Sequence, residues 1–422
     1  MLYDTKFAGQ ILRTAFRPST FSFRSLFWSL AVLIVFPIFN AVIWSLQMLD
    51  HVFYPKLRHT TVEKPVFVLA NPRSGTTFLH RLMAMDEERF THMRLWQTIF
   101  PSVLAYRTIA FIGRIDRVVG RPLGRMLGLL ERAAFKGWDG VHHVGFNQAE
   151  EEETVFISSL IDPPIHFAIP HPQEYRHHIM LDDLSAERRA PIMAKYKRAL
   201  RAHVFATGNN RVLLSKNVFM GQRIESILEV FPDARFVHLV RHPYSSLAST
   251  ISMFTGPWSF FNPDVPKDSD DYRYWAEIGM DTYSRVHRLE PELHERGVKF
   301  VTFTYEQLTS NPKGTVESIY ESMDVEMSPE FARRLDDETA KAQRYQSTHA
   351  YNLDEYGMKP ADIYNTIPEI FEAYGFEKNP GSETSDGGID AAVGVADRAA
   401  ADAAVSAGAP ASAGMHAVPS AG

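Results

Sequence analysis

Residues 65–80, PVFVLANPRSGTTFLH, decide the fold because they join a buried strand to a helix through a short loop of small and hydroxylated residues. The apolar run is typical of a strand inside a parallel sheet. A loop at a helix N-terminus collects free backbone N–H groups and the positive end of the helix dipole, so it can hold a tetrahedral anion. Gly75 lets the backbone approach such an anion closely. The side-chain donors of the loop are Arg73, Ser74, Thr76 and Thr77. The stretch therefore predicts a site for a phosphate-like group rather than a plain turn.

The loop departs from the Walker A pattern of ATP-binding proteins, G-x-x-x-x-G-K-[ST]. Ala70 occupies the position of the first glycine, and Thr76 occupies that of the lysine. Both changes disfavour ATP–magnesium chemistry. An ATP-dependent kinase with a degenerate loop is nevertheless one functional alternative.

Two further segments place cations at the ends of predicted strands. In RFVHLVRHPYSSLASTISMF, Arg241 follows the strand and Ser249 lies eight residues later, so both can contact one phosphate if the next helix starts at Tyr244. In LLSKNVF, Lys216 stands at the end of another strand. Lys216 is also compatible with a surface lysine whose stem packs on the core.

These segments together resemble the sulfotransferases that use 3′-phosphoadenosine 5′-phosphosulfate (PAPS), especially the bacterial branch with a PRSGTT loop. The resemblance covers roughly residues 63–376. It implies that the loop holds the 5′-phosphosulfate and that Arg241 and Ser249 hold the 3′-phosphate. It also implies that Lys216 contacts the bridging oxygen and the transferred sulfonate, although Asn217 and Val218 replace the residues that usually follow this lysine. The implied reaction requires no metal ion.

The general base is expected within residues 142–156, HHVGFNQAEEEETVF, which resemble an H-x-x-G-x-x-x-P-E-E segment of the same branch, with Ala149 where proline is usual. A buried carboxylate with a raised pKa can accept a hydroxyl proton, so Glu150 or Glu151 is the first candidate, and His142 or His143 is the next. The alternative is that the four glutamates form the solvated start of a helix, where the dipole favours acids.

Short apolar strands alternate with helices after Val62, which predicts an α/β fold. The expected architecture is P-loop-like and has three layers, with a central, mostly parallel sheet flanked by helices. We expect one catalytic domain over residues 63–378. Predicted strands lie at 65–70, 211–215, 235–240 and 299–305, and the helices that follow them at 76–85, 221–230, 244–254 and 312–323.

Residues 1–62 are expected to form a basic segment followed by a membrane-associated apolar helix. Residues 26–49 carry no charge and span about 36 Å as a helix, enough to cross a bilayer. Pro37 permits a break and a re-entrant path. Lys6, Arg13, Arg17 and Arg24 precede the segment, which places the N-terminus in the cytoplasm. A re-entrant or surface-lying segment keeps the catalytic domain on the cytoplasmic face, and we expect this arrangement.

Residues 102–136 mix apolar residues with regularly spaced arginines and predict a basic amphipathic insertion, split into two helices near Gly120 and Pro122. A solvated face over a core is an equal alternative. Residues 379–422 are rich in Ala, Gly and Ser and predict a flexible tail.

The net charge of −6 argues against nucleic acid as a partner, and the absence of cysteine excludes disulfides and thiolate chemistry. The leading hypothesis is transfer of sulfonate from PAPS to a hydroxyl group on a hydrophobic or lipid-like acceptor. The alternatives are the ATP-dependent kinase and a non-catalytic, membrane-anchored protein that only binds the nucleotide.

Overall fold

The centre of the protein is a five-stranded sheet in the order β2-β3-β1-β4-β5, and every neighbouring pair runs parallel. The computed structural model describes residues 5–18, 21–135, 148–208, 210–342 and 353–378. The strands are β1 (Val66–Ala70), β2 (Phe90–Thr91), β3 (Val212–Asn217), β4 (Arg235–Val240) and β5 (Phe300–Thr304). The predicted α/β class is confirmed, and the sheet is entirely parallel.

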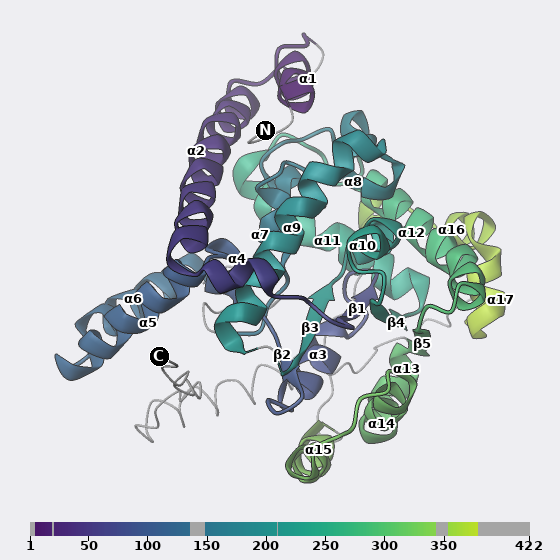
Figure 1. Cartoon of the computed structure of the whole chain (residues 1–422). Coiled ribbons are helices and arrows are strands. Elements are labelled where there is room, and N and C mark those ends of the chain that lie inside the picture. Colours follow the sequence, from purple (N-terminus) through teal and green to yellow (C-terminus); the bar gives the residue numbers. More distant parts are fainter. Residues whose placement is uncertain (1–4, 19–20, 136–147, 209, 343–352, 379–422) are drawn as a thin grey trace, which may run out of the picture.

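Helices surround this sheet, as Figure 1 shows. They are α1 (Thr5–Ala15), α2 (Phe23–Phe53), α3 (Thr76–Ala84), α4 (Leu95–Ile99), α5 (Val103–Val118), α6 (Pro122–Phe135), α7 (Glu153–Ile157), α8 (Arg176–Ile179), α9 (Ala186–Thr207), α10 (Ile224–Val230), α11 (Pro243–Phe261), α12 (Asp270–Glu295), α13 (Tyr305–Ser310), α14 (Pro312–Ser322), α15 (Pro329–Ala342), α16 (Pro360–Thr366) and α17 (Pro368–Tyr374). Short 3-10 helices are η1 (Pro55–His59), η2 (Pro163–Phe167), η3 (Pro172–Tyr175), η4 (Leu181–Asp183), η5 (Met220–Gln222) and η6 (Asp354–Tyr356).

Both faces of the sheet are covered, because successive side chains of a strand point to opposite sides and every residue of the central strand β1 is apolar and buried. In β1, Phe67 and Leu69 pack with residues of α9, α10 and α12. Val66, Val68 and Ala70 pack on the other side with residues of α3, α14 and α15. The apolar side chains on both faces of β1 thus account for the three layers.

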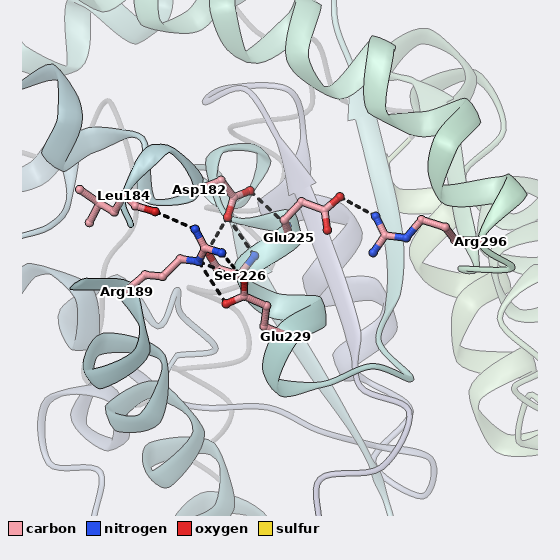
Figure 2. A network of polar contacts seen from close by, with 7 residues as sticks. All are labelled: Asp182, Leu184, Arg189, Glu225, Ser226, Glu229 and Arg296. Atoms are coloured by element: carbon pink, nitrogen blue, oxygen red, sulfur yellow. Dashed lines mark hydrogen bonds and ion pairs between the residues drawn. The ribbon is translucent and has the colours of Figure 1, made fainter. Parts of the chain in front are cut away.

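A polar network fastens the helices on one of these faces, shown in Figure 2. The Asp182 carboxylate accepts hydrogen bonds from the backbone N–H groups of Glu225 and Ser226, at 3.1 and 2.9 Å. These N–H groups belong to the first turn of α10 and have no partner inside the helix. Ion pairs from Arg189 to Glu229 and from Arg296 to Glu225 then tie α10 to α9 and to the end of α12.

The apolar segment forms α2, a single helix that begins at Phe23 and continues through Pro37 to Phe53. The continuous helix contradicts the re-entrant path, and the surface-lying alternative stays a prediction. Proline removes one backbone hydrogen bond, but α2 is held on both sides of it, by Arg24 to the carbonyl of Phe260 and by Asn40 to that of Ser158.

Of the described residues, α2 is the one helix long and apolar enough to cross a membrane. Length and composition alone do not separate an anchor from a core helix or a signal sequence. Only 22% of its most apolar window is buried, which disfavours a core helix.

The segment 102–136 forms α5 and α6, separated near Gly120 as predicted. The predicted tail, residues 379–422, lies outside the described residues.

Candidate functional site

The loop after β1 has a backbone that only certain residues can adopt. Gly75 is the N-cap of α3 with φ of 83°, and Arg73 has φ of 66°. A Cβ added at Gly75 would lie 2.9 Å from Cδ2 of Tyr305, so glycine is required by conformation and by space. Ser74 is fully buried, and its Oγ has no hydrogen-bond partner among the described residues. A buried hydroxyl without a partner in the protein is suited to a ligand.

The second predicted anion site lies against this loop. Arg241 follows the last residue of β4, and Ser249 lies in α11, which begins at Pro243, one residue before the predicted start. Arg73 Nε donates to Ser249 Oγ at 3.2 Å, and Arg241 Nη1 donates to the Arg73 carbonyl at 2.8 Å. Because β1 and β4 are parallel neighbours, their carboxyl ends bring the two segments together at one edge of the sheet.

Tyr305 is a residue of this site that the sequence interpretation missed. The Arg241 guanidinium stacks over its ring, with Cζ 4.3 Å from the ring centroid. The same ring occupies the space that a side chain at Gly75 would need. A cation over an aromatic face is attracted by the ring quadrupole. The available signal was its position directly after β5, the strand next to β4, at the same edge of the sheet.

Lys216 lies near the end of β3, on the other side of β1, and its side chain is fully buried. The alternative of a surface lysine is therefore wrong. Its Nζ lies 2.9 Å from Glu151 Oε1 and 3.2 Å from Thr77 Oγ1. Lys216 thus connects the glutamate segment, residues 150–153, to the loop after β1, residues 71–77, which we call the anion loop.

The four glutamates are not a solvated helix start. Helix α7 begins only at Glu153, and Glu150, Glu152 and Glu153 are buried. An antiparallel bridge between Arg94 and Ala149 draws this segment into the protein.

Each of three glutamates has a different partner. Glu151 faces Lys216, and its side chain is 21% exposed. Burial raises its pKa, while the Lys216 ammonium opposes that rise. Glu152 accepts a hydrogen bond from Ser215 Oγ at 2.7 Å, and burial raises its pKa to about 8.

Glu153 forms an ion pair with Arg223, which also pairs with Asp162, each at 3.0 Å and all buried. Glu153, Arg223 and Asp162 therefore form a buried ion-pair network that stabilises the fold.

Two further points concern the third candidate base and a metal site. His142, the third candidate base, lies outside the described residues. In the part of the chain that the structure describes, no group of three or more His, Asp or Glu side chains is placed to hold a metal ion.

A buried histidine, His80 in α3, lies close enough to this centre for the Lys216 charge to act on it. Burial lowers its pKa well below the usual value, and the neighbouring His92 and Lys216 add to this. His80 is therefore neutral at physiological pH.

A family model described as the sulfotransferase family matches residues 145–329. The chain is also 26% identical over 364 residues to the omega-hydroxy-beta-dihydromenaquinone-9 sulfotransferase Stf3 of Mycobacterium tuberculosis and to that of Mycobacterium bovis. Each alignment covers 83% of this chain and 85% of the relative.

Two solved structures have a similar fold. The sulfotransferase STF9 of Mycobacterium avium superposes with a TM-score of 0.63 at 20% identity, covering 83% of this chain and 86% of that one. The sulfotransferase STF1 of Mycobacterium tuberculosis also gives 0.63, at 21% identity, covering 86% and 92%. At this identity the likeness shows the fold.

Proposed function

Because this chain belongs to the sulfotransferase family and is itself a sulfotransferase, we propose that it transfers the sulfonate of PAPS to a hydroxyl group on a hydrophobic or lipid-like acceptor. One observation carries the proposal: a single loop contacts Ser249 through Arg73 and Lys216 through Thr77. PAPS carries a phosphosulfate and a separate 3′-phosphate, so it needs two anion sites close together. This arrangement supports both.

The residues present fit such a donor. Ser74 Oγ, which has no hydrogen-bond partner in the described part of the chain, and the Gly75 backbone suit the 5′-phosphosulfate, together with Thr76 and Thr77 at the start of α3. Arg241 and Ser249 suit the 3′-phosphate, and the position of Arg73 between the two sites suits either group.

Glu151 is the proposed base, in preference to Glu150 and His142, because it contacts the lysine beside the loop. It accepts the proton of the acceptor hydroxyl as the new oxygen–sulfur bond forms. When bound, PAPS supplies an activated sulfonate whose bond to the bridging oxygen breaks in the same step. Lys216 stabilises the negative charge that develops on the departing adenosine 3′,5′-bisphosphate. Positioning and charge stabilisation suffice for this step, so the proposal includes no metal ion.

The acceptor class is supported by two observations. The relative Stf3 is named for a hydroxylated menaquinone, which is a lipid. The apolar surface of α2, α5 and α6 is mainly exposed, which suits an enzyme that meets its acceptor at a hydrophobic surface.

The proposal is tested by incubating the full chain with sulfur-labelled PAPS and extracted membrane lipids. The expected result is a labelled lipid, formed without added magnesium. Magnesium-dependent transfer from ATP instead would indicate the kinase, and donor binding without any labelled product would indicate a protein that only binds the nucleotide.

The 3′-phosphate site is tested separately with adenosine 3′,5′-bisphosphate. Arg241→Ala should weaken binding by about 2–3 kcal/mol, the cost of a lost charged hydrogen bond. Arg296→Ala, which removes an exposed arginine at the end of α12, is the matched control and should bind as the parent does. Equal affinity of the Arg241 variant would disprove this assignment.

A further inference from the structure

The exposed large hydrophobic residues of the described chain are confined to one part of the molecule. All of them lie within residues 16–53 and 109–130, apart from Phe260. Phe260 itself packs on Trp28 of α2, with ring centroids 6.0 Å apart. Figure 1 shows α2 along one margin of the molecule, with α5 and α6 continuing from its end. We call these exposed residues the apolar margin.

Helix α2 is apolar over most of its surface, and the few polar residues in it lie mainly on the side that faces the catalytic domain. The side that faces the catalytic domain is mostly polar, and the outer side is apolar. At about 100° per residue, the two sets lie on opposite sides of the helix. In water the apolar side would face the core. Buried residues include Ser25, Ser29, Asn40, Gln47 and Asp50, and exposed ones include Phe27, Ile34, Ile38, Val42 and Val52.

The catalytic domain is attached along the whole of α2. Near its start, Arg24 Nη1 donates to the Phe260 carbonyl at 2.7 Å. In its middle, Asn40 accepts a hydrogen bond from Lys195 Nζ at 2.6 Å. At its end, the Asp50 carboxylate accepts from the N–H of Val103 at 2.9 Å.

A helix that crosses a bilayer could not keep these contacts. Its middle turns would lie in hydrocarbon, and the contact with Asn40 would bring the Lys195 ammonium and a polar part of the domain with it.

We propose that α2 lies in the plane of a lipid surface, with its outer side in the membrane and the catalytic domain on the aqueous side. This makes the chain a monotopic protein in which domain and N-terminus are on one side of the membrane. An in-plane helix buries its apolar face by about 5–10 Å at the boundary between headgroups and acyl chains.

The charge of the neighbouring helices favours an anionic lipid surface over another protein. Asp116 lies within this arginine-rich stretch, and its buried carboxylate is used internally, accepting the N–H groups of Leu123 and Gly124 in the first turn of α6. The cations remain on the outside. They are Arg107, Arg114, Arg117, Arg121 and Arg125, all exposed. Such a set is attracted to acidic headgroups.

A chain of contacts also connects α2 to the segment that carries Glu151. Phe39 of α2 contacts Phe100 beside α4, with centroids 6.4 Å apart. At the other end of α4, the N–H of Leu95 donates to the Gln148 carbonyl, in the segment that leads to Glu151. Delivery of a lipid acceptor along this route rests on the proposed function, whereas the docking itself does not.

The orientation can be measured directly because the chain has no cysteine. Single variants Phe27→Cys, Ile38→Cys and Val52→Cys sample the start, middle and end of α2, and Ser318→Cys on the exposed side of α14 is the control. Each full-length variant is labelled with a polarity-sensitive fluorophore. It is then mixed with phosphatidylcholine vesicles, with and without phosphatidylglycerol, that contain lipids quenching at a shallow or a deep position.

The three α2 labels are expected to move into an apolar environment and to be quenched equally, best by the shallow quencher. The control label should stay in water. Deep quenching at position 38 with shallow quenching at 27 and 52 would show a helix that crosses the bilayer. Labels that stay in water with both vesicle types would overturn the proposal. Labels that leave water without vesicles, as the protein concentration rises, would show that a second copy covers the apolar margin.

A substitution measures the strength of the contact. Ile38→Asp should reduce vesicle partitioning at least about tenfold, because an apolar side chain is lost and a charge is brought to the membrane. Ser318→Asp adds the same charge elsewhere and should not change it. Both variants should bind adenosine 3′,5′-bisphosphate as the parent does, which excludes a folding defect. Partitioning of the Ile38 variant equal to that of the parent would contradict the proposal.

Discussion

Glu151→Gln is the change that tests the chemistry most directly. Glutamine keeps the size of the side chain and can still accept a hydrogen bond from Lys216, but it cannot accept a proton from the acceptor. Loss of a positioned base lowers kcat by about 10²–10⁴, or roughly 3–5 kcal/mol of barrier. Affinity for adenosine 3′,5′-bisphosphate should change little, since the anion contacts assigned to Arg73 and Arg241 remain.

The same change has a structural cost that must be measured. Lys216 has no exposed surface, and the variant leaves its charge without an anionic partner. Removing one partner of a fully buried pair costs about 3–5 kcal/mol. Because Glu151 is 21% exposed, water can replace part of this, and we expect roughly 1–3 kcal/mol. Activity is therefore compared at temperatures well below the unfolding midpoint of each variant.

The pH dependence separates the two effects. A base works when deprotonated, so kcat/KM of the parent should rise with pH and level off above the pKa of Glu151, which burial raises above its ordinary value of 4.5. Glu151→Gln should lose this acidic limb, whereas Glu150→Gln, the matched control in the next position, should keep it. If Glu151→Gln retains kcat within about threefold of the parent and keeps the limb, Glu151 is not the base.

Three further changes probe the loop, the lysine and the buried acid. Gly75→Ala would place a side chain at a φ of 83° and its Cβ 2.9 Å from Tyr305 Cδ2. Binding of adenosine 3′,5′-bisphosphate, measured by calorimetry, should therefore weaken at least about tenfold. The control Gly256→Ala in α11, where an added Cβ meets nothing within 4 Å, should leave binding unchanged. Lys216→Met removes the cation that opposes the raised pKa of Glu151, so the acidic limb of the pH–rate profile should move to higher pH; an unmoved limb would contradict their coupling. In the folded protein Glu152 keeps its proton up to about pH 8, whereas in the unfolded chain it loses the proton near pH 4.5. The free energy of unfolding, measured with denaturant, should therefore fall as the pH rises between these values, by at most about 5 kcal/mol. If a Glu152→Gln variant showed the same fall, the cause would lie elsewhere.

The sheet was predictable because β1 is a continuous apolar run and the other long strands are largely apolar segments between helical segments. The strand at residues 235–240 has the predicted bounds, and the observed β1 differs from its prediction only at Pro65. Strand β2 could not be predicted in this way. It consists of Phe90 and Thr91, which pair with Val212 and Leu213 of β3. Two residues carry no periodicity, so this strand depends on a neighbour more than a hundred residues away in the chain.

The anion loop and the site around it differ in how far the sequence determines them. Arg73, Gly75 and the hydroxyl residues are adjacent in the chain, so their local chemistry could be predicted. The choice between Glu150 and Glu151 could not, because adjacent side chains point in different directions. The bridge at Ala149 sets those directions, and only the folded chain shows Glu151 facing Lys216.

Helix α2 shows why an apolar segment does not by itself predict a topology. Its composition satisfies the length and hydropathy of a membrane span, and the few polar residues inside it look like defects in such a helix. The fold gives these residues a common function, since Asn40, Gln47 and Asp50 are all bound to the catalytic domain. A polar side chain that would be costly in hydrocarbon is favourable where it attaches a domain. In the proposed in-plane docking, the polar residues of α2 attach it to the domain, and its apolar residues contact the lipid.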